Sequence, residues 1–395
     1  MINTDETNNV QKAVNAVKNG QTAFCKFLSA NDTGLTGAHQ SGIYIPQASY
    51  SILFDQPGEK GSNKKKVVSI KWPDGGETES VFTYYGQKTR NEYRITRFGR
   101  NFEFLRPKYT GALFVLVKQK ESEYTSFVLN SEEEIDEFLL RFSLSPASTN
   151  CLISVTPNLD FELNVEFRSF VSSLSVDFPT STEMSEAARN IEEKVYDQKE
   201  WIVSAPDQKL IRWVCTEYSL FRAIEIDRYQ AIIQKGFTKI EDFLDVAQTV
   251  LNRRKSRAGK SLEHHLSALF KGNGLTFEEQ ARTEGHKTPD FLFPSSAAYH
   301  NPTFPTDHLV TLAAKTTCKD RWRQILSEAD RLRNGKKFLC TLQRGISPDQ
   351  LSEMQTEQVI LVVPKPYIVE FPRDFREQIW SLHKFIKFIK YIEST

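Results

Sequence analysis

Two patterns of hydrophobic and polar positions divide the chain near residue 160. Before that point, short apolar runs alternate with turn sequences such as PDGG at 73–76, a pattern typical of β-strands joined by tight turns. The apolar runs lie at 42–46, 67–72, 81–85, 112–117 and 126–129. The first 160 residues are therefore predicted to be β-rich.

One helix interrupts these strands. Ser131 precedes Glu132, Glu133 and Glu134, so a capping side chain is followed by acids at the positive end of the helix dipole. The sequence EIDEFLLRF then supplies an apolar face. A helix is predicted to begin directly after Ser131.

Helical periodicity takes over after a stretch at 158–177 that has no clear pattern. Helices are predicted at 183–194, 209–235, 240–270 (with a break near 254–259), 319–333, 348–355 and 371–392. Strands are predicted at 290–293, 308–316, 337–342 and 358–363. This alternation indicates an α/β domain with a mixed central sheet and covering helices. We therefore expect domains at 1–160 and 178–395, joined by a linker or hinge at 161–177.

Composition narrows the class of protein. A chain of 395 residues is longer than one hydrophobic core usually serves, so two domains are expected. A composition of 39% hydrophobic and 26% charged residues is typical of a globular protein. The net charge of +1 points to no partner, so any nucleic-acid contact must come from local patches. The five cysteines include no CxxC pair, which excludes a disulfide framework or a cysteine zinc site. With a polar N-terminus and no apolar run of about 20 residues, we expect a cytoplasmic protein without a membrane partner.

Three residues could support phosphodiester cleavage. The chemistry needs oxygen ligands for Mg²⁺ and a cation beside the attacking water. Asp290 enters a predicted strand and Lys315 ends the next one. In the general nuclease pattern an acid lies two residues before the lysine, but Ala313 stands there. Glu328, thirteen residues after Lys315 and about two turns into the predicted helix, is a possible substitute.

Each of these residues also has a structural interpretation. Asp290 follows a proline and could simply make a turn, and Lys315 could be a solvated strand end. Glu328 could form an ordinary helix ion pair with Arg331. The combination of the three is more specific than any one alone.

Longer segments carry a family resemblance. NRRKSRAGKSLE, TPDFLFPSSAAYH and KTTCKDRWRQIL in the C-terminal half, and SANDTG, GAHQSGIYIP and KTRNEYRITRFGR in the N-terminal half, closely resemble the EcoRII family of type II restriction endonucleases. The resemblance runs through nearly the whole chain in the same order. It implies a nuclease domain of the EcoRII, PspGI and SsoII group, in which an aspartate, a lysine, twelve residues and a glutamate form the motif.

The resemblance assigns roles to individual residues. It implies that Asp290 and Glu328 hold Mg²⁺ while Lys315 orients the attacking water. Glu263 matches a further active-site carboxylate, and Tyr299 matches a tyrosine linked to the site. The alternatives are an exposed helix charge for Glu263 and a packed loop aromatic for Tyr299.

Two C-terminal segments are candidates for reading the cleaved DNA site. Lys319, Asp320 and Arg321 form a cation–acid–cation triplet that suits consecutive C·G pairs, and the alternative is a solvated or phosphate-contacting helix start. A second segment, interpreted as a basic loop, would neutralise phosphates. It contains Arg253, Arg254, Lys255, Arg257 and Lys260.

A third candidate interface lies in the N-terminal half. Its residues fall in a predicted strand–turn–strand, and the alternative is a sheet edge blunted by charge. The resemblance implies a B3-like pseudo-barrel that binds effector DNA, with His39 in the matching loop. The candidate residues are His39, Lys88, Arg90, Glu92, Arg94 and Arg97.

The resemblance also implies a complete activity. We expect a Mg²⁺-dependent homodimer that cuts double-stranded DNA at 5′-CCWGG, flips out the central pair and binds a further copy of the site as an allosteric effector. A cognate cytosine methyltransferase would belong to the same system without forming a stable complex. The rival hypotheses are a non-cleaving DNA-binding regulator and a structure-selective repair nuclease.

Overall fold

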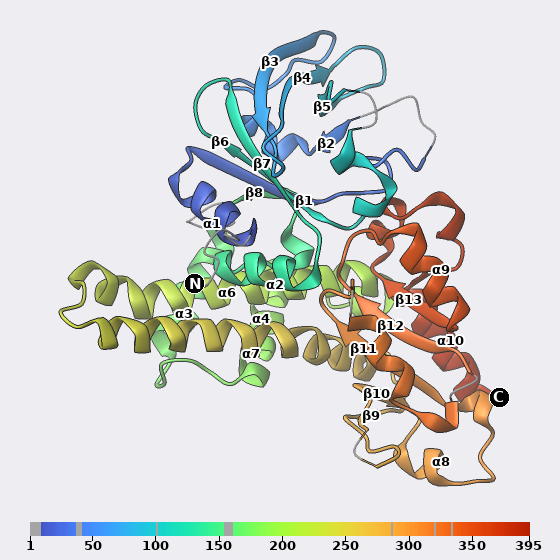
Figure 1. Cartoon of the computed structure of the whole chain (residues 1–395). Helices are drawn as coiled ribbons and strands as arrows, with labels where there is room; N and C mark the ends of the chain where they lie inside the picture. The colour runs from blue at the N-terminus through green and yellow to red at the C-terminus, as the bar shows by residue number, and fades with distance from the viewer. Residues whose placement is uncertain are drawn as a thin grey trace, which may run out of the picture.

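The computed structural model describes residues 9–36, 42–99, 102–153, 161–285, 287–319, 321–332 and 335–395. The N-terminal part is a curled eight-stranded sheet, at the top of Figure 1, with strand order β2-β5-β4-β3-β7-β6-β1-β8. Only the β3–β7 pair is parallel among the paired strands of this sheet. The strands are β1 Thr22–Phe27, β2 Ile43–Ile45, β3 Asn63–Lys71, β4 Glu77–Tyr85, β5 Glu92–Thr96, β6 Leu113–Lys118, β7 Glu123–Leu129 and β8 Cys151–Ile153.

Alternation along the strands builds two cores on the two faces of this sheet. In β6, Phe114 and Leu116 join the core inside the curl, whereas Val115 and Val117 face the other side. Helices α1 (Asn9–Asn19) and α2 (Glu132–Phe142) cover that second face. The predicted helix start is confirmed, because Ser131 and Glu134 form a capping box.

The C-terminal part is a six-stranded mixed sheet of order β14-β13-β12-β11-β10-β9. Strands β11 to β14 run parallel, and β9 and β10 run antiparallel to their neighbours. Helices α6, α7 and α10 cover one face, while α9 and the 3₁₀ segments pack on the other. The predicted α/β fold is therefore confirmed. The strands are β9 Glu278–Glu279, β10 Phe291–Phe293, β11 Val310–Lys315, β12 Lys337–Thr341, β13 Val359–Val363 and β14 Trp380–Ser381.

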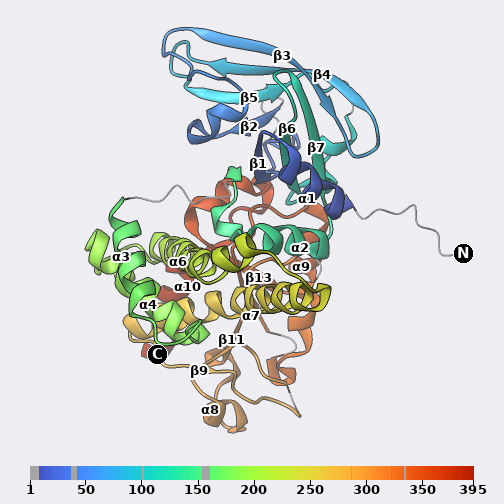
Figure 2. The ribbon, with the colours of Figure 1, turned by 90° about the vertical axis from the view of Figure 1, so that its left-hand side faces the viewer.

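A layer of helices lies below the curled sheet and beside the second sheet (Figures 1 and 2). The two longest, α6 and α7, form an antiparallel pair whose turn lies far from the second sheet. The helices of the C-terminal part are α3 Phe161–Ser173, α4 Ser181–Tyr196, α5 Trp201–Ser204, α6 Pro206–Lys235, α7 Ile240–Gly272, α8 Ser296–His300, α9 Pro348–Thr356 and α10 Leu382–Ser394.

One prediction about this helical layer was wrong. The expected break near 254–259 is absent, and α7 runs through it, because the main helix-disfavouring residue there is Gly259 and Arg257 is buried. The segment predicted as a linker or hinge, 161–177, includes α3. Leu163, Phe167 and Val171 recur every four residues and bury one face of α3 against α4 and α6.

Two further predicted helices are shorter or of another type. The segment after β11 is not an α-helix; it forms the 3₁₀ turns η6 (Arg321–Ser327) and η7 (Asp330–Leu332). The terminal helix begins at Leu382 and not near 371, because Pro372 and Trp380 belong to a 3₁₀ turn region and to β14. No helix among the described ranges is long and apolar enough to cross a membrane.

The two parts meet through close main-chain contacts. The main-chain N–H of Ala30 donates to the carbonyl of Glu370 at 2.8 Å. Gly111 has φ +82°, and a Cβ there would lie 2.3 Å from the carbonyl oxygen of Gly345. A side chain at residue 111 would therefore separate the two parts.

Asp207, buried in the first turn of α6, ties together the far end of the second sheet. Its carboxylate accepts from the main-chain N–H of Lys365 (2.9 Å), Leu382 (2.8 Å) and His383 (3.2 Å). Two of these are orphan donors at the start of α10. Asp207 therefore joins α6, α10 and the segment after β13.

We expect Asp207→Ala to lower the free energy of unfolding by about 3 kcal/mol, since it leaves buried N–H donors unpaired. Asp207→Asn retains one acceptor oxygen and should lose less. Urea denaturation followed by circular dichroism measures both changes. A loss below about 1 kcal/mol for the alanine variant would contradict this role.

Candidate active site and DNA interface

Asp290 and Lys315 are brought together by the register of two antiparallel strands. Phe291 of β10 pairs with Leu312 of β11, so Asp290 lies at the start of one strand beside the end of the other. Asp290 Oδ2 accepts from the main-chain N–H of Ala314 at 2.8 Å and lies 3.4 Å from Lys315 Nζ. The carboxylate is buried, while the lysine side chain remains 31% exposed.

The charges of Asp290 and Lys315 both shift the pKa of the Glu328 carboxyl group. Glu328 follows η6, and its main-chain carbonyl accepts from the Thr283 hydroxyl at 2.6 Å. Burial raises the pKa of Glu328 to about 7, the negative charge of Asp290 adds to the rise, and Lys315 opposes it. Glu328 thus reaches the site from an irregular segment and not from an α-helix.

Glu263 on α7 belongs to the same cluster through a residue that the sequence did not single out. Gln280 Nε2 donates to Glu263 Oε2 at 3.1 Å and to Asp290 Oδ1 at 3.0 Å. Lys260 also donates to Glu263, at 2.8 Å. Burial raises the pKa of Glu263, and Asp290 contributes to the rise. No spacing in the sequence indicates that Gln280 contacts these acids, because the conformation of the loop after β9 brings it to them.

Tyr299 contacts Glu284 and the main chain of Arg331. The buried Tyr299 hydroxyl donates to Glu284, and both groups accept from the main-chain N–H of Arg331 at 3.1 Å. The Arg331 guanidinium in turn donates to the carbonyls of Tyr299 and Phe304. The Arg331 guanidinium is therefore engaged with main-chain carbonyls and not in the predicted alternative, a helix ion pair with Glu328. Through its contact with the Arg331 N–H, Tyr299 supports the segment that carries Glu328.

The acidic groups suit a hard cation. Among the described residues, no three or more histidine, cysteine or acidic side chains converge tightly enough to hold a metal by themselves. Mg²⁺ commonly binds one or two carboxylates and completes its shell with water and substrate phosphate oxygens. Asp290 and Glu328 are two carboxylates of this kind, and the negative charge of Asp290 contributes to the raised pKa of Glu328.

The candidate base-reading segment is held by the N-terminal part. Arg321 Nε donates to Glu132 Oε1 at 2.7 Å, its main-chain N–H donates to Glu132 Oε2 at 2.8 Å, and the guanidinium also pairs with Asp136. The Lys319 ammonium donates to Asn130. All three partners lie on α2 or just before it. Asp320 lies outside the described residues.

The segment interpreted as a basic loop lies on α7, and its arginines are engaged in packing. Arg257 is buried and its guanidinium stacks on Tyr218 at 3.6 Å, so it is not in an exposed loop as predicted. Arg253 lies over Phe178 at 4.4 Å. Arg254 pairs with Glu225 and donates to the carbonyls of the last turn of α2. Lys255 and Lys260 are exposed.

The candidate effector residues divide into exposed and buried groups. Lys88, Arg90 and Arg97 are exposed around β5. Arg94 is buried; it lies 3.4 Å from Glu92 and donates to the carbonyl of Gly42 at 3.3 Å. His39 lies outside the described residues.

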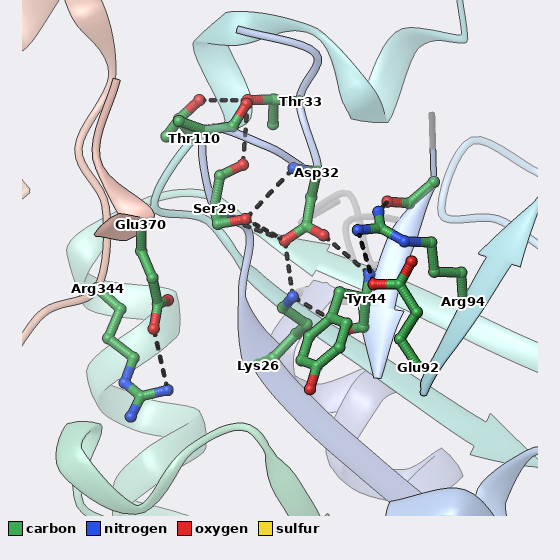
Figure 3. Close-up of polar contacts among 12 residues, drawn as sticks. Lys26, Ser29, Asp32, Thr33, Tyr44, Glu92, Arg94, Thr110, Arg344 and Glu370 are labelled. Carbon is green, nitrogen blue, oxygen red and sulfur yellow. Dashed lines mark hydrogen bonds and ion pairs between the residues drawn. The ribbon is translucent and has the colours of Figure 1, made fainter. Parts of the chain in front are cut away.

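A buried network fixes the turn that follows β1 and contains Ser29 and Asp32 (Figure 3). Asp32 accepts from Lys26 (2.7 Å), from the Ser29 hydroxyl (2.7 Å) and from the main-chain N–H of Tyr44 (2.9 Å). Glu370 of the C-terminal part lies beside this turn and pairs with Arg344 at 3.3 Å. This turn therefore touches the C-terminal part, since the main-chain N–H of Ala30 donates to the carbonyl of Glu370.

Comparison with known proteins follows this two-part division. Residues 17–153 match the family described as restriction endonuclease EcoRII, N-terminal, and residues 221–386 match EcoRII C terminal. The type II restriction enzyme EcoRII of Escherichia coli is 37% identical over 385 residues, 92% of each chain. The type II restriction enzyme SsoII of Shigella sonnei is 26% identical over 149 residues, 36% of this chain and 48% of SsoII.

Solved structures that match the chain cover a little more than half of it. Metal-depleted Ecl18kI in complex with uncleaved, modified DNA has a TM-score of 0.46 and 18% identity, covering 58% of this chain and 84% of that one. The PspGI–substrate DNA complex has a TM-score of 0.45 and 17% identity, covering 55% and 94%. On the strength of the sequence matches to both parts, the chain belongs to the EcoRII family of type II restriction endonucleases.

Proposed function

We propose that this protein is a Mg²⁺-dependent restriction endonuclease that cleaves double-stranded DNA at 5′-CCWGG and is activated by a second copy of that site. The observation that carries the proposal is the contact of Asp290 with Lys315, with Glu328 within electrostatic reach. A charged trio of this kind, with Asp290 and Lys315 at strand ends and Glu328 on the irregular segment after η6, serves phosphodiester hydrolysis better than it serves folding.

Each group of the trio has a distinct task in hydrolysis. The Ala314 N–H orients the Oδ2 oxygen of Asp290, and the Oδ1 oxygen accepts from Gln280. Lys315 would hold and polarise the water that attacks the scissile phosphate. Glu328 and Asp290 would hold Mg²⁺, which when bound neutralises charge on the phosphate.

Autoinhibition is supported by the contacts of α2. Glu132 and Asp136 occupy the donors of Arg321, the group proposed to read a C·G pair. Burial alone would lower the pKa of Arg321, but these two acids outweigh it and raise the pKa. The acids thus take the place that electronegative atoms of DNA would take, and α2 must move before Arg321 can read a base.

The effector role is proposed for the N-terminal part as a whole. Lys88, Arg90 and Arg97 are exposed there, and none of them contributes to the Asp290 site. Binding of a second DNA copy would favour the state in which α2 has left Arg321. His39 and Glu92 would act in that binding, and the buried Arg94 would orient Glu92 through their ion pair.

A homodimer is proposed because one active site cuts one strand of a two-fold site. The end of α6 and the start of α7 form a helical arm that exposes apolar side chains in the single chain: Ile233 (66%), Ile240 (73%), Phe243 (51%) and Leu244 (55%). We assign this helical arm to contact with a second copy. The pairing would also place two catalytic parts on one DNA.

The rival class is a DNA-binding regulator that does not cleave. Such a regulator would not need an acid like Asp290 held by a main-chain N–H with a lysine beside it, and this chain has both features. A structure-selective nuclease would use the same trio but ignore sequence. A Mg²⁺ digest of a long DNA of known sequence, with its fragment ends mapped, distinguishes all three.

Lys315→Ala is expected to lower the cleavage rate by about 10²- to 10⁴-fold, because it removes the group that activates water. Specific DNA binding in the absence of Mg²⁺ should survive. Lys384→Ala, which removes an exposed lysine from α10, is the matched control and should cut normally. Steady-state cleavage and gel-shift assays measure both properties, and near-normal cutting by the Lys315 variant would remove the site assignment.

The double variant Glu132→Gln, Asp136→Asn should cut single-site DNA faster than the natural chain by about 5- to 150-fold, the range of ordinary allosteric coupling. It frees Arg321 without unfolding α2, whose capping box uses Ser131 and Glu134.

The matched control is Glu133→Gln, Glu137→Gln on the same helix, which leaves the Arg321 contacts intact. A truncated chain beginning just before Phe161 keeps α3 in its core and should behave like the released variant. If single-site cleavage stays slow in both, α2 does not inhibit.

Ile240→Lys with Leu244→Lys should convert the dimer into a monomer, since the two positions share one face of α7 and charge there opposes apolar burial. Analytical ultracentrifugation measures the mass. Val369→Lys, at an equally exposed apolar residue elsewhere (65%), should leave it unchanged. Identical masses for all three proteins would exclude the helical arm as the interface.

A further inference from the structure

Gln280 lies between two acids of the candidate site and touches both. The two hydrogens of its amide nitrogen match two acceptors, Glu263 Oε2 at 3.1 Å and Asp290 Oδ1 at 3.0 Å. These acids come from separate elements, α7 and the start of β10. A single neutral side chain therefore fixes the separation of two carboxylates that would otherwise repel each other.

The backbone of Gln280 gives an independent indication. Its φ is +52°, in the left-handed region that glycine and asparagine tolerate far better than glutamine. The conformation is held by the bond from its own N–H to the carbonyl of Asp290, at 3.1 Å. A strained, exposed residue that is not glycine, held against an active-site acid, indicates a task for its side chain.

Other hydrogen bonds to Asp290 and Glu263 use different oxygens or different donors, so the contribution of Gln280 can be identified. Asp290 Oδ2 is taken by the Ala314 N–H and Lys315, so Oδ1 is oriented by Gln280. Glu263 Oε2 is shared between Gln280 and Lys260, and the Lys260 side chain is 46% exposed. Of the two donors to Glu263, Gln280 is the one that also contacts Asp290.

We propose that Gln280 is a positioning residue that holds the Glu263 and Asp290 carboxylates at a fixed separation, so that a divalent cation meets preorganised oxygen ligands. The inference rests on the proposed function, because it takes Asp290 as a metal ligand. Gln280 itself does not bind the cation in this arrangement. Hydrogen-bond partners of metal ligands typically change metal affinity by about 10- to 100-fold when they are removed.

The test uses the full chain and Mn²⁺ alone, with the free ion measured by its electron paramagnetic resonance signal. Gln280→Met keeps the length of the side chain but removes both donors. Gln280→Gly removes the side chain and relieves the positive φ. Gln11→Met, which removes an exposed amide that donates to Asn15 on α1, is the matched control.

Both Gln280 variants should bind Mn²⁺ about 10- to 100-fold more weakly than the natural chain. The glycine variant should melt no lower than the natural chain, which separates the role of the side chain from folding. In cleavage assays the Mg²⁺ concentration at half-maximal rate should rise by a similar factor, while the rate at saturating Mg²⁺ changes less than the affinity.

Two different failures can be told apart. If the natural chain binds Mn²⁺ and both Gln280 variants bind it equally well, the positioning role is wrong and the proposed nuclease site stands. If the natural chain binds no Mn²⁺ and cuts no DNA with Mg²⁺, the proposed function fails and this inference fails with it.

Discussion

The antiparallel register of β10 and β11 is the constraint on which the candidate site depends. Pairing of Phe291 with Leu312 places Asp290 where the Ala314 N–H can orient it and Lys315 can reach it. A slip of one residue would turn these side chains to the other face of the sheet. The register is fixed because β10 and β11 bury apolar side chains on both faces, so the fold and the site are specified by the same contacts.

The parts of the structure that could be predicted from the sequence are those governed by local periodicity. The central strands were found because continuous apolar runs such as VTLAA permit little else. The helix after Ser131 was found because its capping box is local. The same logic indicates that Asp290 and Lys315 lie at strand ends, whereas Glu328, also named from the sequence, lies after a 3₁₀ turn and not in the predicted helix.

The remaining features depend on partners that lie far away in the sequence. Arg257 was interpreted as part of a phosphate-binding loop, yet it stacks on Tyr218 of α6. Glu132 was interpreted as a dipole-stabilising acid, yet Glu134 makes the cap while Glu132 is buried against Arg321. No local pattern in the sequence indicates that Gln280 joins Glu263 and Asp290. Composition cannot separate an arginine that faces DNA from one that faces an aromatic ring, because both need a planar cation.

The contact of α2 with Arg321 has an energetic consequence for activation. A buried carboxylate such as Glu132, 2% exposed in its side chain, is costly unless a cation pairs with it. In the proposed activation, withdrawal of α2 into water would relieve that cost for the acid, and DNA would offer Arg321 a replacement acceptor in the same step. The proposed closed and open states would then exchange one set of charged contacts for another, so their energies would lie within the few kcal/mol that a second DNA copy supplies. A hydrophobic cover over the same segment would lack this property, because its removal would expose apolar surface with no compensating partner.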